Sequence, residues 1–493
     1  MSLTRRNLLA GIAASLPLAA EARIAAAPRP RLRPTGLRAP GTPPGPEQIL
    51  SESGLSQVTG FALRDLETGR AVEQYRPDAA LPPASVTKAV TALYALSALG
   101  PEYVFRTAVA ISGPVVDGRV QGDLYLIGGG DPQLDTDGLA SLAEQTRAAG
   151  ITGVNGRAYV VASALPYAPS IDPSQPSYVG YNPAISGLNL NFNRVHFEWK
   201  PNGGDFSTRL SARTAHHDPV VQSVEMRIED RGAPVFDYAS ADGRDLWSVS
   251  RRALGKGGAR WLPVRAPRNY AAEVFRTVAE GHSLRLPPFE SIAVAPRGLT
   301  PVASTESAAL KPMLRAMLKY STNLTAEVAG LRASQALALP ADSLAASARS
   351  MTDWLRRDYA LSRATFVNHS GLSDQTRICA DEMVQVLDIA ASGPLPELMK
   401  AYPLRDKARR ETAWDECIVS AKTGTLNFTR GLSGYLTGIN GKRFAFAIFS
   451  ADLDARARAG AAETPRGARS WMGRARVQEL ELLRRWASLY GAA

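Results

Sequence analysis

The segment P-P-A-S-V-T-K-A-V-T-A-L-Y-A-L, from Pro82 to Leu96, carries the strongest structural signal in this chain of 493 residues. Two prolines followed by a small polar residue are typical of a helix start, so we expect Ser85 to open a helix. Positions three apart share a helix face, which places Lys88 beneath the Ser85 hydroxyl. A serine becomes a nucleophile when a base removes its proton, and lysine can be that base where burial or a nearby cation favours its neutral form. The pair therefore predicts a serine nucleophile with a lysine base.

A second polar pair follows in the helical pattern M-L-K-Y-S-T-N-L-T-A-E-V, where Ser321 and Asn323 are predicted to open another helical segment. A serine hydroxyl at this place can relay a proton between Lys88 and a leaving amine. Asn323 can orient Lys88 and contact a substrate amide, because its side chain both donates and accepts hydrogen bonds.

The third motif lies in the strand-like run I-V-S-A-K-T-G-T-L, which contains Lys422, Thr423, Gly424 and Thr425. A lysine at a strand edge offers a cation to a substrate carboxylate, and the glycine lets the substrate backbone approach closely. The backbone N–H of Thr425, with that of Ser85, could form an oxyanion hole. Each motif is weak alone, but the three together, in this order and on suitable elements, form a specific signal.

The three motifs resemble those of the penicillin-recognising serine enzymes, which are the D-Ala-D-Ala peptidases and the serine β-lactamases. A finer resemblance is to the class C low-molecular-mass penicillin-binding proteins, the D-alanyl-D-alanine carboxypeptidase/endopeptidases. It is carried by Gly122–Leu134, Tyr181–Asn191, Val264–Phe275 and Asn368–Ser373, and it covers roughly residues 45 to 450. The middle motif reads Ser-Thr-Asn where Ser-Asp-Asn is commoner in the family, but the serine and the asparagine are both kept.

The resemblance implies hydrolysis of D-Ala-D-Ala-type bonds in peptidoglycan stem peptides and cross-links, through an acyl-enzyme on Ser85. It implies that Lys88 accepts the serine proton, that Ser321 passes a proton to the departing amine, and that Lys422 and Thr423 bind the terminal carboxylate. β-Lactam antibiotics are expected to acylate Ser85 and to leave slowly. No cofactor is expected.

Spacing predicts the domain organisation. About 235 residues separate Ser85 from Ser321, an insertion for which a compact β-lactamase has no room, and the family places two extra domains there. We expect an α+β fold, a β-lactamase/transpeptidase-like antiparallel sheet flanked by helices, with two nested inserted domains rich in β-strand. The predicted limits are 49–105 and 298–493 for the catalytic domain, 106–196 and 262–297 for the inserted domain, and 197–261 for a small β-rich domain nested within it.

Local patterns add detail to this division. Hairpins are predicted at Thr68-Gly69 and Asn440-Gly441, the latter a favoured two-residue turn. The pattern from Val104 to about Asn193 indicates short strands and turns.

The first 22 residues have the pattern of an export signal, because two arginines precede a short apolar run that ends in small residues. Thr4–Leu9 resembles a twin-arginine signal, and an ordinary secretory signal is the alternative. We expect cleavage after Ala22 or Ala27, a linker over 28–48, and a periplasmic protein.

The net charge of +11 suits a cell wall or membrane surface that carries anionic groups. The basic residues are scattered and no nucleic-acid-binding motif is present, so a nucleic-acid partner is excluded. No later apolar run is long enough to cross a bilayer, which leaves peripheral attachment as an option. The arginine-rich segment from Asp452 onward has no role that the sequence assigns.

The few cysteines and histidines narrow the chemistry further. Cys379, expected to cap a helix, and Cys417 could form a disulfide in an oxidising compartment or remain two separate buried thiols. Neither they nor His216-His217-Asp218 predict a metal site, because adjacent side chains point apart and no further ligand is evident. The absence of a histidine beside the nucleophile favours lysine as the base.

Two other functions stay open. A β-lactamase needs rapid deacylation, and no Glu-containing loop motif provides the extra base. A non-catalytic wall-binding scaffold would use the inserted domains and would not need the complete catalytic set.

Overall fold

The computed structural model describes residues 43–404, 417–460 and 462–491. The predicted export signal and most of the predicted linker lie outside these residues. The last three linker residues, 46–48, instead begin helix α1 (Pro46–Ser53). Pro46 suits the first helical turn, and Ile49 and Leu50 are buried, so this segment is held by packing rather than left as a linker.

A six-stranded antiparallel sheet joins the two ends of the chain, in the order β17-β18-β19-β20-β1-β2. Strand β1 pairs with β20 from Thr59 opposite Ser450 to Asp65 opposite Phe444. The predicted hairpins at Thr68-Gly69 and Asn440-Gly441 are confirmed as the β1–β2 and β19–β20 connections. The strands are β1 (Thr59–Asp65), β2 (Ala71–Tyr75), β17 (Lys400–Ala401), β18 (Ile418–Leu426), β19 (Thr429–Thr437) and β20 (Arg443–Ala451).

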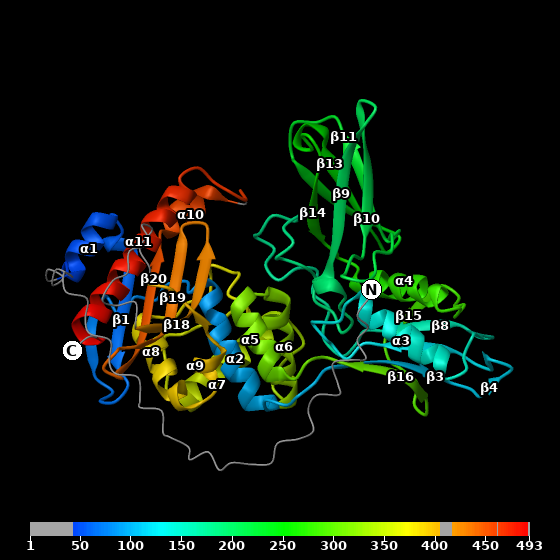
Figure 1. Cartoon of the computed structure of the whole chain (residues 1–493), viewed down its shortest axis with the longest axis horizontal. Helices are drawn as coiled ribbons and strands as arrows, with labels where there is room; N and C mark the ends of the chain where they lie inside the picture. The colour runs from blue at the N-terminus through cyan, green and yellow to red at the C-terminus, as the bar shows by residue number, and fades with distance from the viewer. Residues whose placement is uncertain (1–42, 405–416, 461, 492–493) are drawn as a thin grey trace, which may run out of the picture. The chain divides into compact units, whose positions relative to one another are not determined.

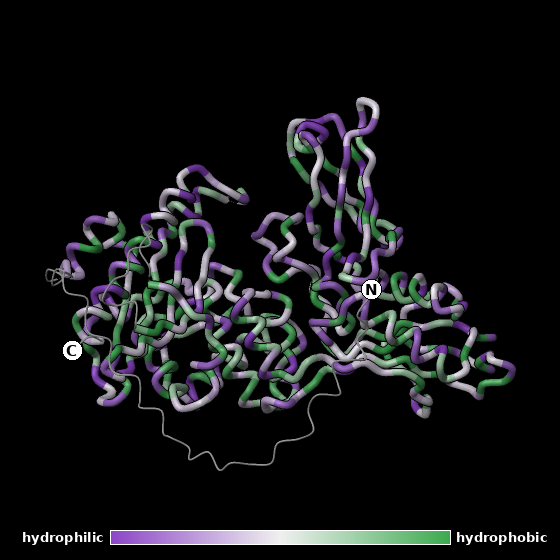
Figure 2. Tube along the Cα trace, viewed as in Figure 1, coloured by the Kyte–Doolittle hydropathy of each residue, from purple (hydrophilic) through white to green (hydrophobic). Residues whose placement is uncertain are grey.

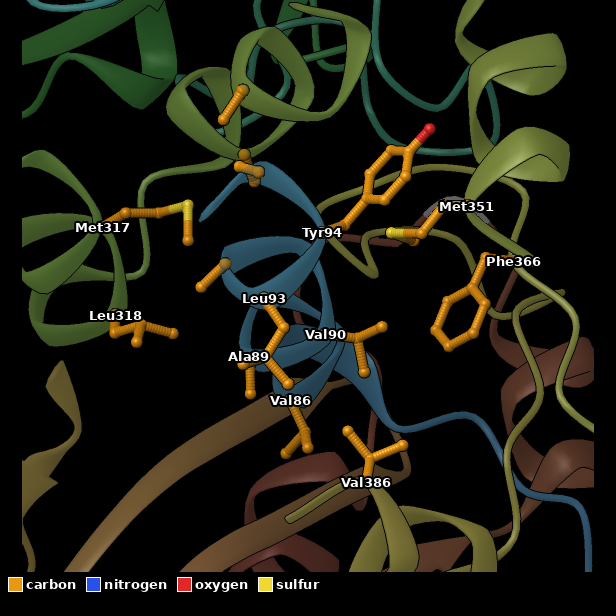
Figure 3. Packing of buried hydrophobic residues seen from close by; sticks show 14 of the residues in the cluster. Val86, Ala89, Val90, Leu93, Tyr94, Met317, Leu318, Met351, Phe366 and Val386 are labelled. Atoms are coloured by element: carbon orange, nitrogen blue, oxygen red, sulfur yellow. The ribbon is translucent and has the colours of Figure 1, made fainter. Parts of the chain in front are cut away.

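Helices cover both faces of this sheet (Figure 1). On one face, α2 lies within a core to which Val86, Tyr94, Met317 and Phe366 contribute (Figure 3). On the other face, Leu482, Leu483 and Trp486 of α11 pack with the buried strand residues in a separate core. The helices around the sheet are α2 (Thr87–Leu99), α5 (Leu310–Tyr320), α6 (Asn323–Ala336), α7 (Leu344–Tyr359), α8 (Ala380–Ile389), α9 (Leu395–Leu398), α10 (Leu453–Ala459) and α11 (Ala468–Trp486).

The residues between α2 and α5 build a second body with its own core. Its main sheet has the order β15-β8-β6-β3-β16 and packs with α3 (Thr136–Ala148) and α4 (Pro267–Gly281). The strands are β3 (Arg106–Ile111), β6 (Leu124–Ile127), β8 (Ala158–Val161), β15 (Phe289–Ile292) and β16 (Thr300–Glu306), with a small sheet of β4 (Val115–Val116), β5 (Arg119–Val120) and β7 (Gly153–Val154).

Two three-stranded sheets extend this body: β10-β9-β14 and β11-β13-β12. Figure 2 shows this part as more hydrophilic than the six-stranded sheet, in keeping with the alternating exposure along β10 and β12. The strands are β9 (Arg194–Asn202), β10 (Asp205–Ser211), β11 (Val224–Glu229), β12 (Phe236–Ala241), β13 (Arg244–Ser250) and β14 (Gly258–Pro263).

One local expectation was wrong. Residues 136–148, predicted as strands and turns, form α3, whose start is capped by Asp135 accepting a hydrogen bond from the Gly138 N–H. Residues 300–306, which fall within the predicted limits of the catalytic domain, form β16 and pair with β3, so the entering and leaving strands of the inserted body are neighbours. We therefore propose that the insertion extends to Glu306 rather than ending at 297.

The structure favours separate thiols over a disulfide. Cys379 precedes α8 at its N-cap, as predicted, and its neighbours Ile378 and Ala380 belong to the core of α2. Cys417 packs in the core of α11. The six-stranded sheet separates these two cores, and the two sulfurs are not bonded to each other.

Within the described part of the chain, no helix is both long and apolar enough to cross a membrane.

Candidate active site

Ser85 lies in a single 3-10 turn, Ala84–Val86, from which α2 continues. This turn is held tightly by two glycines from distant segments. A Cβ on Gly424 would lie 2.4 Å from the Pro83 carbonyl oxygen and 2.9 Å from the Ser85 nitrogen, and a Cβ on Gly371 would lie 1.9 Å from the Ala84 oxygen. Only glycine permits such backbone contact, so strand β18 and the loop that contains Gly371 fix the position of Ser85.

Lys88, one helical turn beyond Ser85, is fully buried and makes three short polar contacts. Its Nζ lies 2.9 Å from Ser85 Oγ, 2.7 Å from Asn323 Oδ1 and 2.7 Å from the Ser370 carbonyl oxygen. The structure thus brings the predicted nucleophile, the predicted base and the predicted orienting amide together, across more than 200 residues of sequence.

The protonation of Lys88 follows from its surroundings. Burial, followed by the positive charge of Lys422, lowers the pKa of Lys88 well below its ordinary value, and the Glu327 carboxylate opposes this shift. A buried ammonium loses its hydration, which favours the neutral amine. A neutral lysine here is suited to accept a proton.

Ser321 and Asn323 lie at a break between two helices rather than within one helical run. Ser321 ends α5 in a left-handed conformation with φ of 60°, and α6 begins at Asn323. This break turns both side chains towards the other motifs. Ser321 Oγ accepts a hydrogen bond from Lys422 Nζ at 3.0 Å, and Asn323 Oδ1 accepts one from Lys88 Nζ. Asn323 Nδ2 donates to the Tyr181 carbonyl oxygen at 2.8 Å, which fixes the orientation of its amide.

Lys422 is on β18 as predicted, and it is 2 % exposed. Its Nζ also donates to the carbonyl oxygen of Thr423 at 2.7 Å. Burial, then the charges of Arg430 and Lys400, lower the pKa of Lys422 to about 7. A carboxylate bound beside this amine would favour its charged form.

The outer edge of β18 is open beside these residues. Strand β17 pairs only with Ser420 and Ala421, and in the described chain no other strand pairs with that edge. An open strand edge offers N–H and C=O groups to an extended peptide. Thr423, Gly424 and Thr425 lie along this edge, and the close approach of Gly424 to the Ser85 nitrogen places the Thr425 segment beside the nucleophile.

Sequence reasoning missed two residues of this centre. The Ser370 carbonyl binds Lys88, and the buried Glu327 holds the same loop by accepting from the N–H groups of His369 at 3.0 Å and Ser370 at 2.8 Å. Burial raises the pKa of Glu327, although these hydrogen bonds and Lys88 oppose the shift. The sequence signal for the Ser370 loop is the N-H-S-G-L-S segment, Asn368–Ser373, which indicates the family but not the contact with Lys88.

The histidine expectation needs correction. His216 and His217 do not point apart: the Nδ1 atoms of both lie 2.8 Å from the carboxylate of Asp137 in the first turn of α3. A loop can bend so that adjacent side chains share one acceptor. In the described residues, no group of three or more His, Cys, Asp or Glu side chains is arranged to hold a metal ion.

Comparison with known proteins finds relatives that match most of the chain. Residues 47–465 match the D-Ala-D-Ala carboxypeptidase 3 (S13) family. The chain is 28 % identical to the D-alanyl-D-alanine carboxypeptidase of Actinomadura sp. (strain R39), over 82 % of this chain and 79 % of that protein. It is 24 % identical to carboxypeptidase Rv3627c of Mycobacterium tuberculosis, over 82 % and 78 %.

A solved structure shows the same fold. Penicillin-binding protein 4 (dacB) from Haemophilus influenzae superposes with a TM-score of 0.70 at 20 % identity, covering 89 % of this chain and 99 % of that one. The β-lactamase/transpeptidase-like α+β fold expected from the sequence is thereby confirmed. With a family match over most of its length, the chain belongs to the D-Ala-D-Ala carboxypeptidase 3 (S13) family, the class C low-molecular-mass penicillin-binding proteins.

Proposed function

We propose that this protein is a serine D-Ala-D-Ala carboxypeptidase that acts on peptidoglycan stem peptides through an acyl-enzyme on Ser85. The observation that carries the proposal is the set of contacts around Lys88 Nζ, which touches Ser85 Oγ at 2.9 Å while two carbonyl oxygens hold it from other sides.

Acylation begins with a directed proton transfer. A neutral amine has two N–H donors and one lone pair, and the oxygens of Asn323 and Ser370 can only accept from it. The lone pair is therefore left for the Ser85 hydroxyl, whose oxygen attacks the scissile carbonyl as its proton moves to Lys88.

The negative charge that develops on the carbonyl oxygen is stabilised by the N–H groups of Ser85 and Thr425. Ser321 completes the path to the leaving group. Its oxygen accepts a hydrogen bond from Lys422 Nζ, so as the C–N bond breaks its hydroxyl can give its proton to the departing D-alanine amine and take one from the Lys422 ammonium.

Lys422 and Thr423 bind the terminal carboxylate of the substrate. A lysine with a pKa of about 7 exchanges its proton easily, and the arriving carboxylate favours the ammonium form. Water then hydrolyses the acyl-enzyme. The same site cleaves cross-links in the proposed endopeptidase reaction, where the bond lies between two stem peptides.

β-Lactams acylate the same serine and leave slowly in this account. The Haemophilus influenzae protein has also been solved in complex with a β-lactam, which supports the proposal for this chain. Rapid deacylation of the β-lactamase type is disfavoured, because both oxygens of the buried Glu327 carboxylate already accept hydrogen bonds from backbone N–H groups.

We place the reaction in the periplasm, with the export signal predicted from the sequence as support. The net charge of +11 favours a location against the anionic wall or membrane.

The test is release of D-alanine from a peptide that ends in D-Ala-D-Ala, alongside cleavage of a D-Ala-linked dimer of stem peptides. The unmutated enzyme should release D-alanine, and Asn323→Ala should reduce kcat by about 100-fold or more because the amine of Lys88 is no longer oriented. Retained binding of peptidoglycan with no cleavage of either substrate would move the assignment to a wall-binding scaffold.

A further inference from the structure

The arginine-rich C-terminal segment sends one buried carboxylate towards the motif strand. Glu479 of α11 faces Arg430 of β19, and the two side chains are 1 % and 6 % exposed. Arg430 Nε lies 3.0 and 2.9 Å from the two carboxylate oxygens, and its Nη2 lies 2.9 Å from one of them. This side-on pairing uses one edge of the guanidinium and fixes its plane.

The other edge of the same guanidinium reaches the substrate-binding strand. Arg430 stands directly opposite Thr425 in the β18–β19 register, and its Nη1 donates to Thr425 Oγ1 at 2.9 Å. Arginine has donors only, so the threonine oxygen must accept this bond. The hydroxyl proton of Thr425 is therefore free to go to a different acceptor.

Thr425 is exposed at the open edge of β18, in the same motif as Lys422 and Thr423. A hydroxyl whose oxygen already accepts from the protein can donate its proton to a ligand at this edge. The acceptor that the proposed substrate brings to this edge is its terminal carboxylate.

Stability alone does not account for the ion pair. Replacing a buried ion pair with apolar side chains of similar volume is often neutral or stabilising, so a pair that only holds α11 against the sheet has no need of two charges. The family match ends at residue 465 and α11 begins at Ala468, so Glu479 lies outside the part of the chain that matches the family.

We propose that Glu479 and Arg430 are a positioning pair that holds the Thr425 hydroxyl as a donor to the C-terminal carboxylate of the peptide substrate. Helix α11 thereby contributes to the preference for a free carboxylate. The inference rests on the proposed function, since it specifies how that site recognises its substrate.

By charge alone, removing Arg430 should strengthen the binding of a carboxylate at Lys422 rather than weaken it. After burial, Arg430 is the largest cause that lowers the pKa of Lys422. Without Arg430, Lys422 would be more cationic and would attract a carboxylate more strongly. A loss of carboxylate preference on removing the pair therefore reports positioning rather than charge.

The experiment compares kcat/KM for two peptides that end in D-Ala-D-Ala, one with a free carboxylate and one with a terminal carboxamide. The variants are Thr425→Val, the double variant Arg430→Met with Glu479→Met, and the triple variant. We expect the carboxylate-to-carboxamide ratio to fall about 10-fold or more in the first two, because a hydrogen-bonding group is lost or misdirected. The triple variant should be no worse than Thr425→Val, since the pair acts through that hydroxyl.

A matched control removes another ion pair of the same helix. Arg485 of α11 lies 2.8 Å from Glu73 of β2, and β2 is at the opposite edge of the six-stranded sheet from β17 and β18. Replacing both with methionine should leave the ratio unchanged. If the double methionine variant at 430 and 479 does not fold, Glu479→Gln keeps the volume and one acceptor, and should lower the ratio by a smaller factor.

Two results separate the possible failures. If the unmutated enzyme hydrolyses the carboxylate peptide but the ratio is unchanged in the pair variants, or the triple variant shows additive losses, this inference is wrong and the proposed function stands. If the unmutated enzyme hydrolyses neither peptide, the proposed function fails and the inference fails with it.

Discussion

The six-stranded sheet and the inserted body differ in where they place lysine amines. Around the six-stranded sheet, Lys88 and Lys422 are buried. In the inserted body, Lys200 and Lys256 are exposed, and the charged side chains that are buried are of other types, such as Asp245.

The burial of strand residues differs between the two regions in the same way. Strand β20 is buried from Phe444 to Ala451, whereas β12 is mostly exposed or partly exposed after Phe236. Burial shifts a pKa, and the two buried lysine amines, Lys88 and Lys422, both lie around the six-stranded sheet. The comparison teaches that the amines suited to proton transfer belong to the six-stranded sheet, whereas the inserted body contributes the Tyr181 carbonyl that holds Asn323 and many solvated side chains.

The largest effect should come from removing the buried base. Lys88→Met keeps the length of the side chain but has no proton acceptor, so the rate of acylation by a β-lactam should fall about 10³-fold or more. Stopped-flow or quenched labelling gives the rate, and thermal unfolding checks that the protein is folded. A variant that is folded and is acylated within 10-fold of the unmutated rate would contradict the role of Lys88.

A glycine comparison tests the tight packing of the nucleophile turn. Gly371 and Gly69 have almost equal φ angles of 71° and 69°, but only Gly371 has a backbone atom, Ala84 O, in the space that a Cβ would fill. Gly69→Ala should cost about 1 kcal/mol of unfolding free energy from conformation alone. Gly371→Ala should cost several times as much, at least about 3 kcal/mol, because backbone must also move. Urea unfolding measures both, and equal losses would show that the turn is not clamped.

The pH dependence of acylation should reveal the second amine. Because the pKa of Lys422 is lowered to about 7, the charged form that binds a carboxylate is lost as the pH rises through that value. For a substrate with a free carboxylate, kcat/KM of the unmutated enzyme should therefore fall on the alkaline side of about pH 7. Lys422→Arg stays protonated, so its lower activity should lack this alkaline decrease. An unchanged alkaline decrease in Lys422→Arg would assign it to another group.

The smallest effect is expected in the inserted body. Arg157→Ala with Glu290→Ala removes an exposed ion pair, whose attraction is screened by solvent. Calorimetry should show a change in Tm of less than about 2 °C, and acylation should be unchanged. A large loss of stability would show that the inserted body also depends on its charges.

Sequence reasoning succeeded where the signal is local. Ser85 and Lys88 are one helical turn apart, and the Asn440-Gly441 hairpin is set by two adjacent residues. The residues that escaped prediction act through contacts distant in sequence: Ser370 reaches Lys88 across 282 positions, and Glu479 reaches Arg430 across 49. Nothing local marks the Glu479 carboxylate as part of a site, and the family-like segment that contains Ser370 does not show which side chain its carbonyl binds. Strand β16 escaped because its partner β3 lies at the other end of the insertion.

The most direct test of the central claim is labelling of the purified protein with a fluorescent penicillin, beside Ser85→Ala. The account predicts a stable covalent label on the unmutated protein, located by peptide mapping to the segment that contains Ser85, and no label on the variant. Absence of label on the unmutated protein, or an equal label on Ser85→Ala, would contradict the claim that Lys88 activates Ser85 as the acylated nucleophile.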